Sequence, residues 1–338
     1  MENTVRWGIL GTGKIARAMA QGLRDAPGAQ LVAVASRSGA GAQAFGAEFG
    51  IERCHGSYQA LAMDPGVDVI YIATPHTLHA ENASLCLAAG KHVVCEKPFT
   101  MNAREAQAVV DIAREKKLFL MEAMWSRFLP AVQEAQRIIA SGEIGVLQQV
   151  QADIGFVANF PPEHRMFNPE LGGGALLDVG IYPLSMAAFF LGPVSQVQAL
   201  AEMGATGVDE QVVFSLLHAG GGTSSCACSL RAQTPTEMTI SGSLGRIRLP
   251  NRFYKPDHLI VETMDGERRV VAMPHLGNGY AHEAIEAMRC IRAGLLESPI
   301  MPHADSVALM HNLDTMRGQI GLVYRSDLSA DQASSGTP

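Results

Sequence analysis

Apolar residues in the first third of the chain follow two alternating periods, which predict strands separated by helices. Short apolar runs predict strands at Val5–Leu10, Leu31–Ala35, Val67–Ala73, Val93–Val94 and Leu118–Met121. Between them, apolar residues recur every three or four positions, as on one face of a helix, at Ile15, Ala18, Met19, Gly22 and Leu23. Further helices are expected from Glu81 to Ala89 and from Asn102, as a cap, to Lys117. The alternation predicts a doubly wound parallel sheet of the α/β class.

The period changes after Met124, where one helix is followed by strands. The helix is predicted at Ala131–Ala140, and the strands at Leu147–Phe156, Val194–Ala201, Gln211–His218, Ser224–Ala232 and Thr236–Leu249. This pattern predicts an α+β domain built on a large, mostly antiparallel open sheet. One face of such a sheet can stay uncovered, and its apolar content favours burial against a second copy in a homodimer. Asp305 is expected to cap a last helix, along which apolar residues repeat at Leu309, Leu313, Met316, Ile320 and Val323.

The length of 338 residues is too great for one small core and predicts two domains. We expect the α/β domain at residues 1–123 and the α+β domain, which would also serve oligomerisation, at 124–325. The glycine turn described below makes the first a dinucleotide-binding Rossmann domain and leaves the second to bind the substrate. The tail, residues 326–338, has almost no apolar content and is expected to be disordered.

Charge and cysteine content narrow the class of partner. The net charge is −7 and the basic residues are scattered, unlike the basic footprint of a nucleic-acid or membrane-surface protein, so a small-molecule partner is favoured. The six cysteines form no C-x-x-C pair, so reduced thiols and no zinc or other metal are expected. With no signal-peptide layout and no apolar run near the ~18 residues of a membrane span, a cytoplasmic location is expected.

A glycine-rich turn joins the first strand to the first helix. It reads Gly11-Thr12-Gly13-Lys14-Ile15-Ala16, a G-x-G-x-x-A pattern. Gly11 permits the tight turn, Gly13 lets the backbone approach a pyrophosphate, and Ala16 allows close helix packing. Because the helix N-terminus attracts phosphates, residues 11–15 are predicted to bind a dinucleotide.

The end of the second strand indicates which dinucleotide is bound. An NAD site usually has an acidic residue there to hold the ribose 2′-hydroxyl, but this chain has Ser36-Arg37-Ser38. Two hydroxyls and a guanidinium suit a 2′-phosphate, since arginine offers planar charge-assisted donors. NADP is therefore favoured over NAD, with a merely exposed Arg37 as the alternative.

Polar residues also follow the next two strands. Thr74-Pro75-His76 with His79 comes after one, and Glu96-Lys97-Pro98 closes the other. In an open α/β sheet, ligands bind outside the carboxyl ends of the strands, so these residues are candidates for cofactor binding and Lys97 for facing a reacting oxygen. The alternative interpretations are that His76 and His79 are ordinary residues at the start of a helix and that Lys97 is an ordinary solvated lysine.

A second group of candidates lies between the predicted helix and strands of the second domain. Three glycines, Gly172-Gly173-Gly174, precede Asp178 and Tyr182. If this stretch is helical, the two side chains, four residues apart, share a face. The alternatives are an N-cap role for Asp178 and a half-buried core position for Tyr182.

These four features, in this order, resemble the family of glucose-fructose oxidoreductase and inositol dehydrogenase over nearly the whole chain. Many relatives carry histidine at the position of Tyr182 and asparagine at that of His76. Tyrosine there, together with Met121–Phe128, is similar to the branch of dimeric dihydrodiol dehydrogenase and NADP-dependent xylose dehydrogenases.

The resemblance implies hydride transfer between nicotinamide and a secondary alcohol or carbonyl of a cyclic polyol, sugar or trans-dihydrodiol. A lysine cation lowers the pKa of a nearby phenol from its usual ~10, so Lys97 and Tyr182 are the expected proton-handling pair, with the formal acceptor left open. Asp178 is expected to orient them. A sugar-ketone reductase and a catalytically silent NADP-binding regulator are the alternatives, and the joint presence of all three residues argues against the regulator.

The substrate pocket is expected to have an aromatic wall. Its candidates are Trp125, Phe156, Phe160, Tyr182, Tyr254 and Tyr280, with Arg165 as a polar group. Each aromatic could equally be a core residue. Because Trp125 follows the last strand of the first domain, it is predicted to pack on the substrate ring.

Overall fold

The computed structural model describes residues 4–328, which form two compact units. Within that range, unit 1 comprises residues 4–128 and 276–307, and unit 2 comprises residues 129–275 and 308–328. The predicted boundaries differ from these units, because they assign residues 124–128 and the returning segment 276–307 to the second domain. Of the predicted disordered tail, residues 329–338 lie outside the described range, whereas Arg325–Asp327 form a short 3₁₀ helix, η5.

Unit 1 is built on a parallel sheet, as predicted. The sheet has six strands, one more than expected, because the short strand Arg53–His55 was missed. The strands are β1 (Val5–Leu10), β2 (Ala29–Ala35), β3 (Arg53–His55), β4 (Val69–Ile72), β5 (His92–Glu96) and β6 (Leu120–Ala123). Their order is β3-β2-β1-β4-β5-β6, so the direction of winding reverses between β1 and β4. In doubly wound sheets, the crevice at such a reversal is where a dinucleotide binds.

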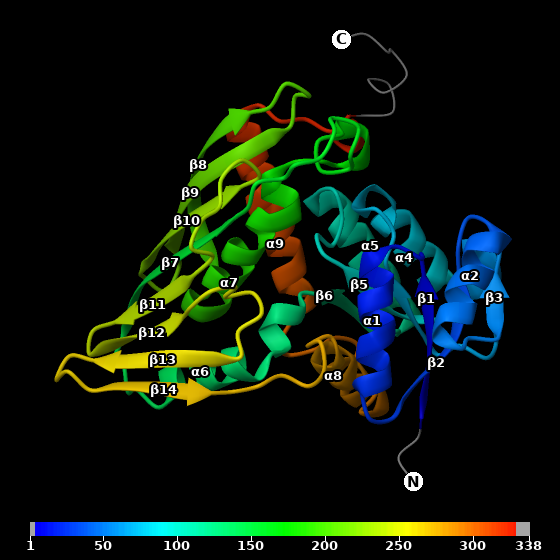
Figure 1. The fold of residues 1–338 in the computed structure, drawn as a ribbon, viewed down its shortest axis with the longest axis horizontal. Coiled ribbons are helices and arrows are strands. Elements are labelled where there is room, and N and C mark those ends of the chain that lie inside the picture. The colour runs from blue at the N-terminus through cyan, green and yellow to red at the C-terminus, as the bar shows by residue number, and fades with distance from the viewer. Residues whose placement is uncertain (1–3, 329–338) are drawn as a thin grey trace. The chain divides into compact units, whose positions relative to one another are not determined.

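Helices separate these strands (Figure 1). They are α1 (Lys14–Asp25), α2 (Gly39–Phe49), α3 (Tyr58–Ala62), α4 (His79–Ala88) and α5 (Ala103–Lys116), with the short 3₁₀ helices η1 (His76–Leu78) and η2 (Trp125–Phe128). The predicted cap of α5 is confirmed, because the Asn102 side chain accepts the Glu105 N–H at 3.0 Å. α2 and α3 were not predicted, nor was a further helix, α8 (Ala281–Arg292), which packs against α1. Gly22 permits this approach, since a Cβ there would lie 2.7 Å from the Tyr280 Cβ.

Unit 2 contains the large, mostly antiparallel sheet that its alternating pattern predicts, with eight strands where five were expected. The strands are β7 (Leu147–Gly155), β8 (Val194–Met203), β9 (Asp209–His218), β10 (Thr223–Ser229), β11 (Met238–Gly242), β12 (Gly245–Leu249), β13 (His258–Thr263) and β14 (Arg268–Ala272). Their order is β14-β13-β12-β11-β7-β10-β9-β8. Within residues 129–275, β7 pairs with β10 in parallel, and the other neighbours are antiparallel. The predicted strand Thr236–Leu249 is in fact the β11–β12 hairpin, and β13 and β14 were missed.

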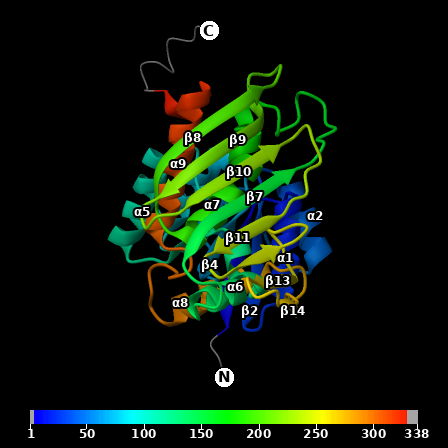
Figure 2. The same cartoon turned by 90° about the vertical axis from the view of Figure 1, so that its left-hand side faces the viewer.

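Helices cover one face of this sheet and leave the other open. α7 (Ile181–Leu191) packs on β7 and β10, and α6 (Pro130–Ala140) packs on β13. The last helix, α9 (His303–Ile320), begins in unit 1 and continues in unit 2, where the Gln319 side chain bonds the backbone of β8 at Ala199 and Val197. Figure 2 shows the strands in front of α7, with the uncovered face toward the viewer.

The prediction that Asp305 caps the last helix is wrong. Asp305 is the third residue of α9, and its carboxylate lies 2.6 Å from Nη1 of Arg127, which is fully buried. A buried guanidinium needs a paired charge, and this requirement explains the acid at that position. Val323, expected on the same helix, lies beyond its end.

The structure bears on two expectations from composition, which concern a membrane span and a metal site. The segment Pro169–Leu191 has 23 residues and a mean hydropathy of 1.6, so an apolar stretch long enough to cross a membrane does exist. This is weak evidence for a span, because 83% of its apolar window is buried inside the protein, as in a core helix. Within residues 4–328, no group of three or more His, Cys, Asp or Glu side chains is arranged to hold a metal ion.

Candidate active site

The structure brings the predicted cofactor segments of unit 1 to one edge of its sheet. Gly11 follows β1, Ser36 follows β2, Thr74 follows β4 and Lys97 follows β5. Because these strands are parallel, all four segments lie at their carboxyl ends. The glycine turn and Thr74 flank the reversal point between β1 and β4.

The glycine turn fits a pyrophosphate. Gly11 has φ of 111°, and a Cβ there would lie 2.7 Å from the carbonyl oxygen of Ala73, so any side chain would clash. At Gly13, no described atom lies within 4 Å of the Cβ position, which leaves space beside the backbone. α1 begins at Lys14 with no acidic residue in its first turn, so its first-turn amides, including those of Lys14 and Ile15, offer positive potential to an anion.

The segment after β2 presents an exposed arginine. The Ser36 N–H donates to the His55 carbonyl at 3.1 Å, which fixes the chain beside β3. The Ser38 hydroxyl accepts the Gly41 N–H at 3.2 Å and so caps α2. Arg37 between them is exposed at the carboxyl edge of the sheet. Arg37 is therefore placed to meet the ribose end of a dinucleotide.

His79 connects the loops that follow β4 and β5. It is buried, with Nε2 3.0 Å from the Thr74 carbonyl and Nδ1 2.9 Å from the Pro98 carbonyl. Burial, aided by His76, lowers its pKa to about 4, so the neutral ring donates to one of the two carbonyls at a time. His79 thus opens α4, as the alternative interpretation held, and also ties down the turn that carries Lys97.

Two buried carboxylates hold the Lys97 turn. Glu96 accepts the Lys97 N–H at 3.1 Å, and its other oxygen accepts the Tyr71 hydroxyl. Glu122, from β6, accepts the Phe99 N–H at 3.1 Å. Burial raises the pKa of Glu122 to about 7. The sequence analysis gave Glu122 no role, although an acid within an apolar strand was a usable signal.

Two of the predicted aromatic residues meet in unit 1. The rings of Trp125 and Tyr280 are stacked with centroids 4.3 Å apart and an interplanar angle of 4°. Trp125 is only 5% exposed, so the stack is well packed. Sequence alone could not pair residues so far apart in the chain.

In unit 2, Asp178 pairs with Arg165. The two guanidinium nitrogens lie 3.1 and 3.4 Å from the two carboxylate oxygens, which is a bidentate arrangement. Asp178 lies within the π-helical turn Leu176–Gly180 and caps no helix with its side chain, so the N-cap alternative is wrong. Pro183 accounts for the wide turn, since proline cannot donate to the carbonyl four residues earlier and its ring would clash with it.

Tyr182 lies in the first turn of α7 and is 9% exposed. Its ring centroid is 5.4 Å from that of Tyr254, at a tilt of 37°. Phe156 follows the end of β7, where its N–H donates to the Ser229 carbonyl, and Phe160 stacks on His164 at 4.0 Å. Unit 2 thus brings together Asp178 with Arg165 and Tyr182 with Tyr254.

Both halves of this arrangement match known families. Residues 5–124 match the oxidoreductase family with an NAD-binding Rossmann fold, and residues 132–248 match the GFO/IDH/MocA C-terminal domain. The chain belongs to the GFO/IDH/MocA oxidoreductase family. Among curated relatives of this family member, the trans-1,2-dihydrobenzene-1,2-diol dehydrogenase of Danio rerio is 39% identical over 96% of this chain and 99% of its own. The Mus musculus enzyme of the same name is 37% identical with the same coverage.

Solved structures agree with this assignment. A levoglucosan dehydrogenase in complex with NADH and levoglucosan aligns with a TM-score of 0.87 and 25% identity over 94% of this chain and 98% of the other. KijD10, a 3-ketoreductase from Actinomadura kijaniata in complex with TDP-benzene and NADP, aligns with a TM-score of 0.81 and 26% identity at the same coverage. The protein is an NAD(P)-dependent dehydrogenase, as predicted.

Proposed function

We propose that this dehydrogenase uses NADP to oxidise a secondary alcohol of a trans-dihydrodiol, cyclic polyol or sugar. The observation that carries the proposal is the placement of Lys97 in unit 1. Its backbone is held by Glu96, and its strand ends at the sheet edge that also carries the glycine turn. The dihydrodiol is the first candidate substrate because the full-length relatives carry that name.

Each unit supplies groups that can manage the proton and charge of the reaction. A dinucleotide held by the glycine turn, residues 11–15, would supply its nicotinamide as the hydride acceptor. The Lys97 cation stabilises the negative charge that develops on the alcohol oxygen. Tyr182 offers a phenol for proton transfer, and Asp178, fixed by Arg165, supplies a neighbouring negative charge.

Reduction of a sugar ketone is the second candidate. It is supported by the similarity to the 3-ketoreductase KijD10, which was solved with NADP. The same side chains serve this direction, with the proton delivered to the carbonyl oxygen instead of removed from the alcohol.

The function is tested in two steps. NADPH fluorescence is first followed as protein is added, to establish cofactor binding. A panel of trans-diols, pentoses, hexoses, inositols and keto sugars is then scored at the nicotinamide absorbance band with each cofactor form. Turnover of alcohols supports the proposal, turnover of keto sugars alone supports the second candidate, and NADPH binding without any turnover contradicts both.

Trp125 is proposed to form the apolar wall for the substrate ring. We expect Trp125→Phe, which keeps an aromatic on Tyr280, to raise the KM for cyclic substrates about fivefold, the ~1 kcal/mol at the low end for a lost apolar contact, and to leave NADP affinity unchanged. Steady-state kinetics on the best panel substrate gives the KM. An unchanged KM with a lowered Tm would assign Trp125 to the core.

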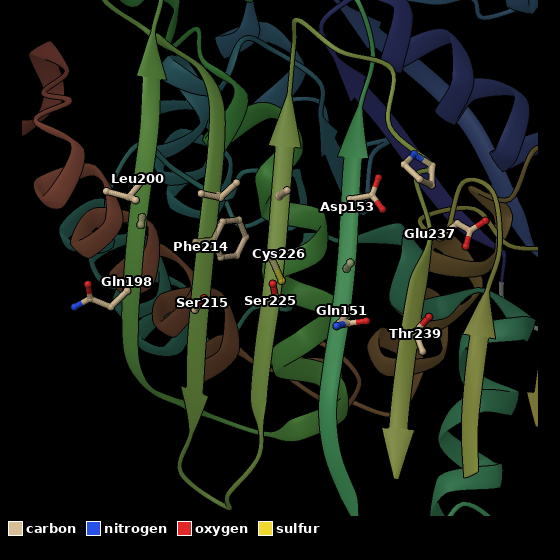
Figure 3. Close-up of a pocket in the computed structure, with 15 residues that line it drawn as sticks. Gln151, Asp153, Gln198, Leu200, Phe214, Ser215, Ser225, Cys226, Glu237 and Thr239 are labelled. Atoms are coloured by element: carbon tan, nitrogen blue, oxygen red, sulfur yellow. The ribbon is translucent and has the colours of Figure 1, made fainter. Parts of the chain in front are cut away.

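We also propose that the open face of the unit 2 sheet binds a second copy of the chain. A shallow groove there crosses β8, β9, β10, β7 and β11, and its side chains are drawn in Figure 3. The register aligns an uncharged polar row, Gln198-Ser215-Ser225-Gln151-Thr239, beside an apolar one, Leu200-Val213-Ala227. Leu200 is 75% exposed and Val213 is 55% exposed. The apolar row ends at Asp153, which pairs with Ala227, and Glu237 lines the same end of the groove. Exposed apolar side chains beside an uncharged polar row suit a self-complementary interface.

A charge within the polar row is expected to separate the copies. In Ser215→Arg, two like charges would be buried where a twofold axis brings equivalent rows together, and the mass from light scattering should fall from dimer to monomer. Thr315→Arg, exposed on α9, is the matched control and should remain dimeric. A monomeric wild-type protein at micromolar concentration would refute the interface.

A further inference from the structure

Asp209 is a buried carboxylate that the proposed mechanism does not use. It is the first residue of β9 and has no solvent exposure. One oxygen accepts the Leu176 N–H at 2.6 Å, and the carboxylate also receives the Ala175 N–H. These amides open the helical stretch that carries Asp178 and Tyr182. Asp209 therefore caps this stretch from a strand 33 residues away in sequence.

Two side chains, Asp209 and Tyr324, contact the glycines that precede this helical stretch. Gly174 has φ of 131°, and a Cβ there would overlap the free carboxylate oxygen of Asp209. The Tyr324 hydroxyl donates to the Gly173 carbonyl at 2.5 Å. Because Asp209 and Tyr324 meet the two successive glycines, the start of the helical stretch has one defined position.

The helical stretch needs this support because its own N-cap gives none. Ala175, at the N-cap, has no side chain that can accept the first amides, and unsatisfied amides at a buried helix start are costly. The π-turn that follows widens the helix just where Asp178 lies. A small movement of Leu176 would therefore shift Asp178, two residues on, and Tyr182 in the next turn.

We propose that Asp209 is a positioning residue, whose ionised carboxylate holds Asp178 and Tyr182 in the geometry needed for proton transfer. This inference rests on the proposed function of those two residues. Asp209 itself lies behind the helix start and is not assigned any contact with substrate.

The groups around Asp209 make its charge dependent on pH near neutrality. Burial raises its pKa to about 7, whereas the amides of Ala175 and Leu176 and the charge of Arg317 on α9 act in the opposite direction. Tyr324 and Cys228, whose own pKa values burial raises, face it as neutral groups. As the pH falls through about 7, the carboxylate gains a proton and one of its oxygens becomes a donor, so it accepts the helix amides less well.

Asp209→Asn tests the charge while keeping the size of the side chain. We expect kcat to fall about tenfold, less than the ~100-fold of an ångström-scale misplacement, with an unchanged KM for NADP. Wild-type kcat should fall on the acid side of about pH 7, whereas the variant should lack this step. Asp64→Asn is the control, since Asp64 is also buried and accepts a backbone N–H, from Gly66 at 2.7 Å, but belongs to unit 1. It should keep the wild-type pH profile.

Hydrogen exchange gives a readout that does not depend on turnover. In wild type, protection of the peptide 172–182, corrected for intrinsic exchange, should fall below about pH 7, and Asp209→Asn should show reduced protection at all pH values. Unchanged kcat and pH profile in Asp209→Asn would overturn the proposal. If that variant does not fold, pH-independent protection in wild type would overturn it. If wild type turns over no substrate but protection changes as expected, the proposed function fails and the support of the helix by Asp209 stands.

Discussion

Replacing Lys97 by alanine is expected to lower kcat at least ~100-fold while leaving NADP affinity largely intact. The backbone of the Lys97 turn is held by Glu96, Glu122 and His79, so the turn should survive loss of the side chain. What would be lost is the cation that we propose stabilises charge on the alcohol oxygen, an interaction expected mainly in the transition state. Steady-state kinetics gives kcat, and NADPH fluorescence gives the Kd.

Lys116→Ala provides the matched control, because Lys116 is largely exposed at the end of α5 and should show wild-type kinetics when truncated. Near-normal turnover in Lys97→Ala would leave Lys97 as a solvated lysine.

A double-mutant cycle with Tyr182→Phe adds a second test. If the two residues act on one proton transfer, the double variant should lose far less than the product of the single losses. If the loss of kcat in the double variant equals the product of the two single losses, Lys97 and Tyr182 act in separate steps.

The architecture of unit 1 was predictable because its signals are local. A strand, a glycine turn with positive φ and an amphipathic helix occur within residues 5–25, and each constrains its neighbour. Buried parallel strands have continuous apolar runs, as in β4 and in Val93–Cys95 of β5, so they stand out from the helices between them. The strand ends then identify the edge on which ligands bind.

Elements with weak local signals were missed. β14 is an edge strand with four of its five residues exposed or charged, so its apolar period is absent. α8 carries the buried acids Glu283 and Glu286 on its inner face, which disguises its amphipathic stripe. β11 and β12 were merged because the hairpin Gly242-Ser243-Leu244-Gly245 has an apolar residue in its turn.

Partners of the site residues could not be found from sequence. Arg165 and Asp178 are 13 positions apart, and Asp209 and Leu176 are 33 apart. Which side chains meet depends on the register of β9 and on the turn widened by Pro183. A sequence that supplies a plausible N-cap, Asp178, does not reveal that a second aspartate, on a distant strand, takes that role.

Arg37→Ala is expected to weaken NADP binding by roughly 10- to 150-fold, the range for removal of a hydrogen bond to a charged group, and to change NAD binding little. Arg37 is exposed at the carboxyl end of β2, where Ser36 is fixed by the His55 carbonyl and Ser38 caps α2. Its neighbours are therefore held by backbone bonds that the substitution leaves in place. The loss should fall on the 2′-phosphate alone, since NAD lacks that group. Fluorescence titration with NADPH and NADH measures both affinities.

Ser36→Asp extends the test, because it should reverse the preference between NADP and NAD, whereas Arg37→Ala should only abolish it. A carboxylate beside the ribose can accept the 2′-hydroxyl of NAD but repels a 2′-phosphate, so this variant should favour NAD. Arg24→Ala removes an exposed arginine from α1 in the same unit and should leave both affinities unchanged. Equal losses for NADP and NAD in Arg37→Ala would show that Arg37 supports the loop instead of reading the phosphate, because only contact with the 2′-phosphate can separate the two cofactors.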